Sequence, residues 1–332
     1  MNLAGGCMGS NFVPGYLELL ESGELHRRVE ALRGMLGNCR LCARRCGADR
    51  SAGGKGACGA GSGLEVSSAC VHTGEEPVLT GTVGVGNVFL AGCCLRCVYC
   101  QNHEISRPDS IGDPRRKTTP EELASVLLDF REKGCPTVGF VSPTHYAPQL
   151  VEALASAAER GFSLPVVYNT GGYDSPELLE LLEGIFDIYL PDVKYADEKY
   201  SAAYSGVADY PRVAREALLE MHRQVGNLVV EDGVAGRGLL VRLLVLPGDV
   251  SGTADTLEFI ARELGNDVYI SLMSQYYPAY VAAEYPPLDR RLLPGEYAAA
   301  VEALERLGFG NGWVQDPVAS PDNYLPGVDF SI

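Results

Sequence analysis

From residue 83 onward, short apolar runs alternate with amphipathic segments. The runs are rich in Val, Ile, Leu and Phe, and they have the length of buried β-strands rather than of helices. The segments between them repeat their apolar positions at helical spacing. Strands that alternate with helices in this way are typical of parallel βα units, so we predict an α/β fold. The six predicted strands cover residues 83–90, 137–142, 165–170, 186–193, 239–246 and 268–273.

Two of the intervening helices have clear start signals. Thr119 and Ser175 each precede a proline and then glutamate, which is the order of an N-cap residue, a first helical position and an acidic first turn. A last helix is predicted over residues 295–307, before a polar, Pro-containing tail. We therefore divide the chain into a Cys-rich segment (1–82), a region of βα units (83–285) and a C-terminal helix with its tail (286–332).

Composition and charge narrow the class of protein. The chain has 332 residues and 46% hydrophobic content, enough for a large core. Its 27 basic and 43 acidic side chains give a net charge of −16, which would repel a phosphate backbone and argues against a nucleic-acid partner. No apolar run reaches the roughly 20 residues of a membrane-spanning helix, and the N-terminus has no signal-peptide pattern. We expect a cytoplasmic protein without a membrane partner.

Cysteine is concentrated in the first third of the chain. Ten of the eleven cysteines lie at or before Cys100, and only Cys135 lies beyond it. A reducing compartment keeps thiols free, so metal ligands are favoured over disulfides. Cys7 and Cys135 are interpreted as ordinary thiols.

Residues 39–63 are rich in Gly, Cys and Arg and have too few apolar positions to build a core. Such a segment needs a metal or a neighbouring domain to hold it. Cys39, Cys42, Cys46 and Cys58 follow a C-x2-C-x3-C-x11-C spacing, which suits either a zinc ion or a second iron–sulfur cluster. The spacing matches neither a ferredoxin nor a zinc ribbon. Cys70 and His72 are reserve ligands.

A second cysteine group follows the first predicted strand. Cys93, Cys97 and Cys100 form a C-x3-C-x2-C pattern, and thiolates at this spacing can bind three of the four irons of a cubane cluster, leaving the fourth iron open. An open coordination position is where a substrate or cosubstrate binds. The alternatives are buried thiols or a zinc site, for which Cys94 or His103 would supply the fourth ligand.

The same residues resemble the radical S-adenosylmethionine (SAM) superfamily, whose signature C-x3-C-x-aromatic-C matches Cys93, Cys97, Tyr99 and Cys100. The runs "CQNHEIS", "VYNTGGY", "DIYLPDVKY" and "LMSQYYP" are similar to the pyruvate formate-lyase activating enzyme-like branch. The resemblance implies a partial (β/α)6 barrel resembling a TIM barrel, with functional groups where strands end. It also implies a [4Fe-4S] cluster that cleaves SAM to methionine and a 5′-deoxyadenosyl radical, and an electron donor such as flavodoxin or ferredoxin.

The resemblance further assigns residues to SAM binding. Asp192 and Lys194 match an Asp-x-Lys that contacts the methionyl group; a solvated ion pair is the alternative. Ser142 and Thr144 stand where many of these enzymes carry a Gly-Gly-Glu motif, and Asn169 stands where Asp is frequent. The remaining residues assigned to the SAM site are Tyr99 and Asn102.

Three further features each have two possible interpretations from the sequence. His145 either donates or accepts a proton near the site, or is a satisfied loop histidine. Arg242 either meets a ligand carboxylate or forms a pair inside the barrel. A group of tyrosines either lines a peptide-accepting mouth or packs at the barrel end: Tyr276, Tyr277, Tyr280 and Tyr285.

Three functions remain open from the sequence. The first is a radical SAM enzyme that activates a glycyl-radical protein, and the second is a radical SAM enzyme that acts on a small molecule or on another peptide residue. The third is a noncatalytic metal-binding scaffold, against which the complete C-x3-C-x2-C motif argues.

Overall fold

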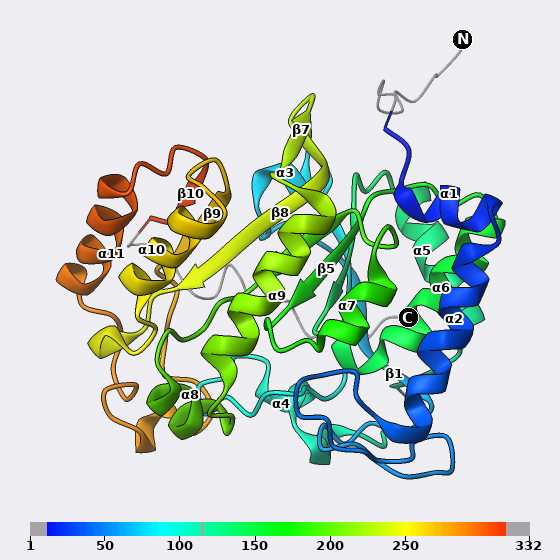
Figure 1. Ribbon diagram of the computed structural model, residues 1–332, viewed down its shortest axis with the longest axis horizontal. Helices are drawn as coiled ribbons and strands as arrows, with labels where there is room; N and C mark the ends of the chain where they lie inside the picture. Colours follow the sequence, from blue (N-terminus) through cyan, green and yellow to red (C-terminus); the bar gives the residue numbers. More distant parts are fainter. Residues whose placement is uncertain (1–11, 114–115, 317–332) are drawn as a thin grey trace.

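The computed structural model describes residues 12–113 and 116–316, so Cys7 and the end of the predicted C-terminal tail lie outside it. One sheet is the centre of the fold, with strand order β10-β9-β8-β6-β5-β4-β2-β1-β3 and β7 paired to β8 (Figure 1). The strands are β1 (Leu64–His72), β2 (Val85–Leu90), β3 (Lys117–Thr118), β4 (Val138–Val141), β5 (Val166–Thr170), β6 (Ile188–Pro191), β7 (Val229–Glu231), β8 (Val234–Leu244), β9 (Tyr269–Met273) and β10 (Gly312–Val314).

The α/β class is confirmed, and the sheet is mostly parallel. Strands β2, β4, β5, β6, β8 and β9 pair parallel in succession and correspond to the six predicted strands, and β10 adds a seventh parallel strand. The antiparallel pairs are β1–β2, β1–β3 and β7–β8. Among the described residues no pairing joins β3 to β10, so the sheet is not shown to close into a barrel.

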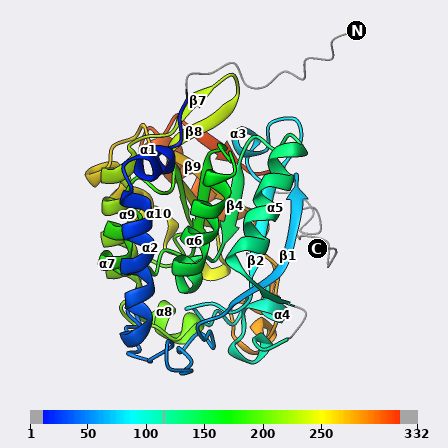
Figure 2. The same cartoon turned by 90° about the vertical axis from the view of Figure 1, so that its right-hand side faces the viewer.

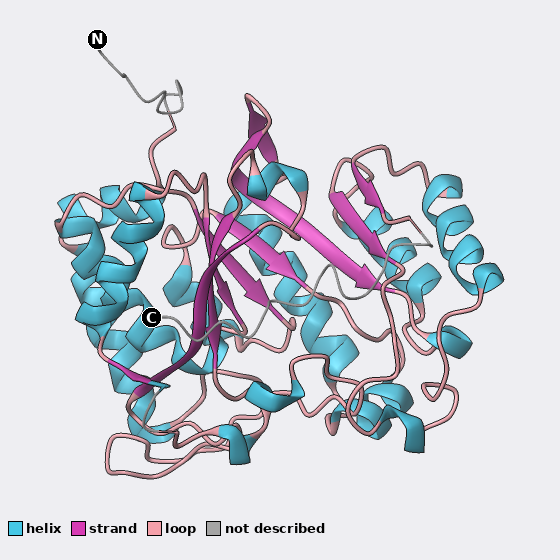
Figure 3. Cartoon of the chain, turned by 180° about the vertical axis from the view of Figure 1, so that it is seen from behind, coloured by secondary structure: helices cyan, strands magenta, loops and turns pink. Residues whose placement is uncertain are grey.

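Helices lie at the sides of the sheet and on one of its faces, and the view from behind in Figure 3 shows the strands in front of them. They are α1 (Gly15–Glu21), α2 (Glu24–Gly34), α3 (Pro77–Thr80), α4 (His103–Ser106), α5 (Pro120–Glu132), α6 (Ala147–Glu159), α7 (Pro176–Leu182), α8 (Glu198–Ser205), α9 (Tyr210–Val225), α10 (Thr253–Glu263) and α11 (Pro294–Arg306). Both predicted caps are present: Glu122 N donates to Thr119 Oγ1 at 3.1 Å, and Leu178 N donates to Ser175 Oγ at 3.2 Å. Among the described residues no helix combines the length and the apolar character that crossing a membrane requires.

The N-terminal region packs on the rest of the fold. Helix α2 lies beside α6 (Figure 2), where Leu25 and Leu32 are fully buried in the main core. The Cys-rich loop that follows α2 lies beside α4 and α8 at one end of the molecule, while the β7–β8 hairpin and α3 lie at the other (Figures 1 and 2). The loop thus obtains from its neighbours the core that its own sequence lacks.

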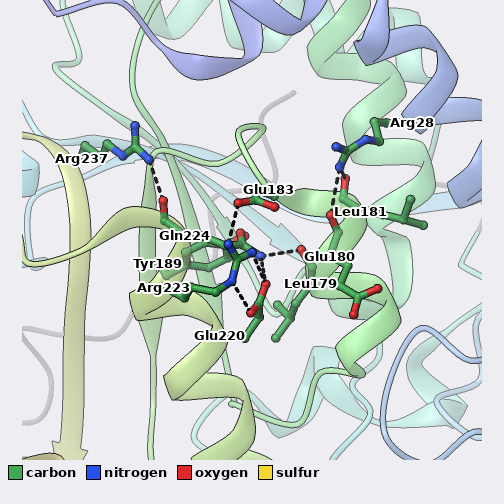
Figure 4. Close-up of polar contacts among 10 residues, drawn as sticks. All are labelled: Arg28, Leu179, Glu180, Leu181, Glu183, Tyr189, Glu220, Arg223, Gln224 and Arg237. Carbon is green, nitrogen blue, oxygen red and sulfur yellow. Dashed lines mark hydrogen bonds and ion pairs between the residues drawn. The ribbon is translucent and has the colours of Figure 1, made fainter. Parts of the chain in front are cut away.

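Polar contacts tie the outer helices to the sheet (Figure 4). Gln224 of α9 accepts a hydrogen bond from Tyr189 Oη of β6 at 2.7 Å and donates to the carbonyl of Leu179 in α7 at 2.8 Å. Arg223 pairs with Glu220 and, at 3.0 Å, with Glu183. These bonds fix α7 and α9 against β6, and so fix the loops at the carboxyl ends of the neighbouring strands.

Candidate functional site

A cavity of about 560 Å³ opens among the strands of the sheet. Each of the parallel strands β2, β4, β5, β6, β8, β9 and β10, or the loop that follows it, contributes lining residues, as do the loop after β1 and the cysteine loop. Parallel βα proteins characteristically place their functional groups at strand ends. The predicted site residues that line the cavity are Cys93, Cys97, Tyr99, Cys100, Asn102, Ser142, Asn169, Asp192 and Lys194.

The cysteine loop leaves β2 through a tight turn at Gly92. This residue has a φ of +81°, and a Cβ there would lie 2.6 Å from the side chain of Ile111 and 3.0 Å from the carbonyl oxygen of Cys58. Only glycine fits this left-handed position without strain. The turn brings three thiols of one short loop to the same cavity.

Each of these three sulfurs has a hydrogen-bonding neighbour. Leu95 N donates to Cys93 Sγ at 3.4 Å, and Ser205 Oγ of α8 donates to Cys97 Sγ at 3.0 Å. Cys100 Sγ lies 3.2 Å from Ser106 Oγ. These contacts hold the sulfurs in place from three separate segments.

The electrostatic environments of the thiols differ. The neighbouring Cys94 thiol, the Leu95 N–H and the Lys194 charge lower the pKa of Cys93 to about 6. Burial raises the pKa of Cys97 to about 11, and it also raises that of Cys100. The Cys93 sulfur is thus the most readily ionised of the three.

Cys94 does not line the cavity. It is buried, and its thiol contacts both Cys93 and Cys42 of the N-terminal segment. Arg44 Nε donates to its carbonyl oxygen. His103 is also outside the lining and stacks on Tyr280, with ring centroids 5.1 Å apart. Neither of the two fourth ligands considered for a zinc ion therefore faces the cavity.

Asp192 and Lys194 form an ion pair after β6. Lys194 Nζ lies 3.0 Å from Asp192 Oδ2, and the two side chains are 20% and 33% exposed respectively. Burial opposes the charge of Lys194, but Asp192 outweighs it and raises the lysine pKa. Tyr210 Oη donates to the carbonyl oxygens of Gly171 and Asp192 at 2.9 Å. The pair is therefore partly sheltered, faces the cavity and is held to the loop after β5.

Thr144 and His145 lie behind the cavity wall rather than in its lining. The Thr144 hydroxyl donates to Asp174 Oδ1 at 2.7 Å. His145 is 2% exposed, and its Nε2 lies 2.7 Å from the carbonyl oxygen of Ala91. Burial lowers its pKa to about 4, so the ring is neutral at pH 7. The geometry therefore favours a buried, neutral loop histidine that is hydrogen-bonded through Nε2, while its Nδ1 has no hydrogen-bond partner among the described residues.

The tyrosines at this end of the fold have different surroundings. Tyr276 is buried, its hydroxyl donates to the Leu288 carbonyl at 2.6 Å, and its ring meets Tyr99 edge-on with centroids 6.0 Å apart. Tyr280 is 47% exposed, and the guanidinium carbon of Arg107 lies 4.1 Å from its ring centroid. Tyr276 thus fits the packing interpretation, whereas Tyr280 is accessible.

A buried charge network on the cavity wall contains Arg242, for which the sequence left an interior pair open without indicating its partners. Arg242 Nε donates to Glu76 Oε1 at 2.8 Å, and its Nη2 donates to both Glu75 and Glu76. Glu75 also accepts from Asn87 at 2.6 Å and lies 3.2 Å from His72 Nδ1. Burial opposes ionisation of Glu75, but Arg242 and His72 hold its pKa below the usual range. Arg242 thus forms the interior pair, with two consecutive glutamates that directly precede the Pro77 helix start.

The N-terminal cysteines lie close to the cysteine loop but outside the cavity lining. Cys39, Cys42 and Cys58 are buried, and Cys46 is exposed. Across residues 12–113 and 116–316, no three His, Cys, Asp or Glu side chains form a group that could hold a single metal ion. Each thiolate of a cubane cluster binds its own iron, so such ligands stand further apart than those of one ion.

Comparisons with known proteins identify the class. The model of the Radical SAM superfamily matches residues 87–260, more than half of the chain, and the chain belongs to this superfamily. Membership implies an enzyme that uses a [4Fe-4S] cluster and SAM. The three thiols on the cavity wall fit such a cluster, because thiolates are its protein ligands.

Individual relatives are more distant. An uncharacterised protein of Methanocaldococcus jannaschii is 30% identical over 302 residues, covering 89% of this chain and 82% of its own. The pyruvate formate-lyase-activating enzyme of Staphylococcus aureus is 28% identical over 121 residues, covering 33% of this chain and 46% of its own. A structure of TYW1 with a lysine-pyruvate adduct bound aligns with a TM-score of 0.46 and 13% identity, over 74% of this chain and 80% of that one.

Proposed function

We propose that Cys93, Cys97 and Cys100 bind the [4Fe-4S] cluster and that SAM occupies the adjoining cavity. The observation that carries the proposal is the convergence of these three thiols and the Asp192–Lys194 pair on one cavity, from segments about 100 residues apart. The loop leaves one iron without a protein ligand. When bound, the cluster supplies the electron that splits SAM into methionine and a 5′-deoxyadenosyl radical, which abstracts hydrogen from the substrate.

Different cavity residues would bind different groups of SAM. Lys194 carries the positive charge that suits the methionyl carboxylate, and Asp192 carries the negative charge that suits its amino group. Asn169 and Ser142 supply polar groups on the neighbouring strand ends, and Asn102 supplies another beside the cysteines. Tyr99 lies against Tyr195 and Tyr276, so it packs the apolar side of the loop. Thr144 would act indirectly, through Asp174.

We further propose that the substrate is a glycyl-radical protein and that a flavodoxin or ferredoxin delivers the electron. The partial similarity to the pyruvate formate-lyase-activating enzyme supports this proposal, because the name of that relative states an activity. The accessible Tyr280 beside Arg107 offers a surface on which a protein chain can pack.

Anaerobic reconstitution with iron and sulfide, followed by reductant and SAM, tests the chemistry. The Cys93→Ala/Cys97→Ala/Cys100→Ala variant should lose about four irons per chain and all 5′-deoxyadenosine formation. The matched control is Cys94→Ala, from the same loop, which should keep both because Cys94 is not part of the cavity lining. Unchanged iron and deoxyadenosine in the triple variant would refute the assignment.

The substrate is tested separately. Incubation with pyruvate formate-lyase should give a glycyl doublet in the EPR spectrum if the chain is an activating enzyme for that protein. Deoxyadenosine without a glycyl signal would instead favour a small molecule or another peptide residue. A reconstituted protein that makes no deoxyadenosine would point to the noncatalytic scaffold.

A further inference from the structure

Arg50 is a fully buried cation without a carboxylate partner. Its side chain is 0% exposed, and within residues 12–113 and 116–316 it forms no ion pair. Its Nε and Nη2 donate to the Gly61 carbonyl at 2.9 and 2.6 Å, and its Nη1 donates to the His145 carbonyl at 2.8 Å. Burying a charge is costly unless an opposite charge balances it. The remaining partner is Cys39 Sγ, 3.8 Å from Nη1, and only this partner can become an anion.

Other thiols surround this cation. Cys39 and Cys58 are 5% and 6% exposed. The Cys58 thiol is close enough to feel the charges of three neighbours, Arg50, Cys39 and Cys42. Cys46 and Cys58 flank Gly56: a Cβ on this glycine would lie 3.7 Å from the Cys46 sulfur and 3.2 Å from that of Cys58. Both sulfurs thus border the space that a side chain at Gly56 would fill, and they lie within about 7 Å of each other.

The wall next to these thiols has unsatisfied polar atoms. In the described part of the chain, His145 Nδ1, Tyr146 Oη and Gln149 Oε1 are buried without a hydrogen-bond partner. Cys58 and Arg50 both act electrostatically on the Tyr146 phenol, so this wall adjoins the thiol group. Buried polar atoms normally have a hydrogen-bond partner. Three such atoms without one indicate that a group other than a protein side chain binds next to this wall.

We propose that Cys39, Cys42, Cys46 and Cys58 hold a second iron–sulfur cluster, with Arg50 as its buried counter-charge. The ligand set is entirely thiol, which selects zinc or iron–sulfur centres over hard cations. Cys46 and Cys58 both border Gly56, so their thiols can reach one centre. In the described part of the chain these side chains do not form a group that could hold a single ion, which suits ligands of different irons. Metal-bound thiolates give Arg50 the negative charge that its buried position requires. This site is independent of the proposed SAM chemistry.

Metal content of the full chain tests this site without reference to activity. After anaerobic reconstitution, iron, acid-labile sulfide and zinc are counted in the wild type and in three variants. The variants are Cys39→Ala/Cys46→Ala/Cys58→Ala, Cys93→Ala/Cys97→Ala/Cys100→Ala, and Cys135→Ala as the buried-thiol control. The wild type and the control should hold about eight irons per chain, and each triple variant about four.

The two triple variants separate the two sites. The Cys93/Cys97/Cys100 variant keeps all of its N-terminal thiols. Four irons and a reducible EPR signal in this variant would therefore support the second cluster, even if the N-terminal variant fails to fold. No iron in the Cys93/Cys97/Cys100 variant, about one zinc per chain in place of iron, or wild-type iron in the N-terminal variant would each overturn the proposal. Arg50→Gln should make the reduction potential of this cluster more negative, and an unchanged potential would refute the role of Arg50.

Discussion

The Ser205 hydroxyl donates a hydrogen bond to the Cys97 sulfur at 3.0 Å, joining residues 108 positions apart. Hydrogen bonds to thiolates stabilise the reduced state of an iron–sulfur cluster because they offset its added negative charge. The contact therefore links helix α8 to the redox property on which SAM cleavage would depend.

Ser205→Ala should make the reduction potential of the Cys93/Cys97/Cys100 cluster more negative while leaving its iron in place. A hydrogen bond of about 1 kcal/mol corresponds to a shift of roughly 40 mV for one electron. An EPR-monitored redox titration measures it. Ser201→Ala, on the same helix, is the control, because that hydroxyl bonds only to backbone carbonyls; equal shifts in both variants would contradict the prediction.

Lys194→Gln should weaken SAM binding without loss of iron. A charged hydrogen bond contributes about 1.5–3 kcal/mol, so the KM for SAM should rise roughly 10- to 100-fold. Deoxyadenosine formation at increasing SAM concentrations gives the KM. Lys199→Gln is a close control, because Lys199 pairs with an Asp two positions earlier, as Lys194 does, but is 66% exposed. If neither substitution changes the KM for SAM, Lys194 does not bind SAM.

Arg242→Met should destabilise the fold by about 3–5 kcal/mol, because it removes the guanidinium that pairs with the buried Glu75 and Glu76. Urea unfolding of the protein before metal loading measures this loss. Adding Glu75→Gln and Glu76→Gln to the same chain should recover part of the stability, since the stranded charges are then removed. If the added substitutions bring no recovery, the loss arises from packing rather than from charge.

Asp187 should make stability depend on pH. Its Oδ1 accepts from Gly15 N at 2.9 Å and its Oδ2 from Val166 N at 3.1 Å, and burial raises its pKa to about 7. The unfolded value is about 3.9. Between these two pH values the folded state keeps a proton that the unfolded state has released. The stabilisation of the folded state by protonated Asp187 is therefore complete below about pH 4 and is lost as the pH rises through 7.

The free energy of unfolding of the wild type minus that of Asp187→Asn should therefore fall by about 2–3 kcal/mol between pH 5 and pH 7. Denaturant titrations at half-unit intervals of pH give the difference. Comparing the two chains removes the contributions of groups that they share, and a difference that stays flat would contradict the raised pKa.

The sequence predicts six of the seven parallel strands, because each of the six is a continuous apolar run between turn signals, and most of their ends differ by only a few residues. The seventh, β10, lies in the segment that was assigned to the polar tail. Strand β1 was missed. Its residues lie within the region assigned to the Cys-rich segment, and only their antiparallel pairing with β2 makes them a strand. The cysteines and the Asp192–Lys194 pair could be found because short spacings and strand ends fix where they lie.

Long-range side-chain contacts could not be predicted in the same way. Arg242 and Glu76 are 166 positions apart, and no local pattern states that they pair. Thr144 stands at the expected strand end, but its hydroxyl turns to Asp174, thirty positions further along. Spacing gives the position of a residue, whereas the direction of its side chain depends on the neighbours that the fold brings to it.

The burial of Leu25 and Leu32 against α6 has a practical consequence for how the chain can be divided. Removing residues 1–82, as a minimal enzyme might suggest, would expose this apolar face to water and would delete β1 from the sheet. It would also take away Arg44, which donates to the carbonyl of Cys94 in the cysteine loop. A shortened chain should aggregate instead of yielding an independent catalytic unit.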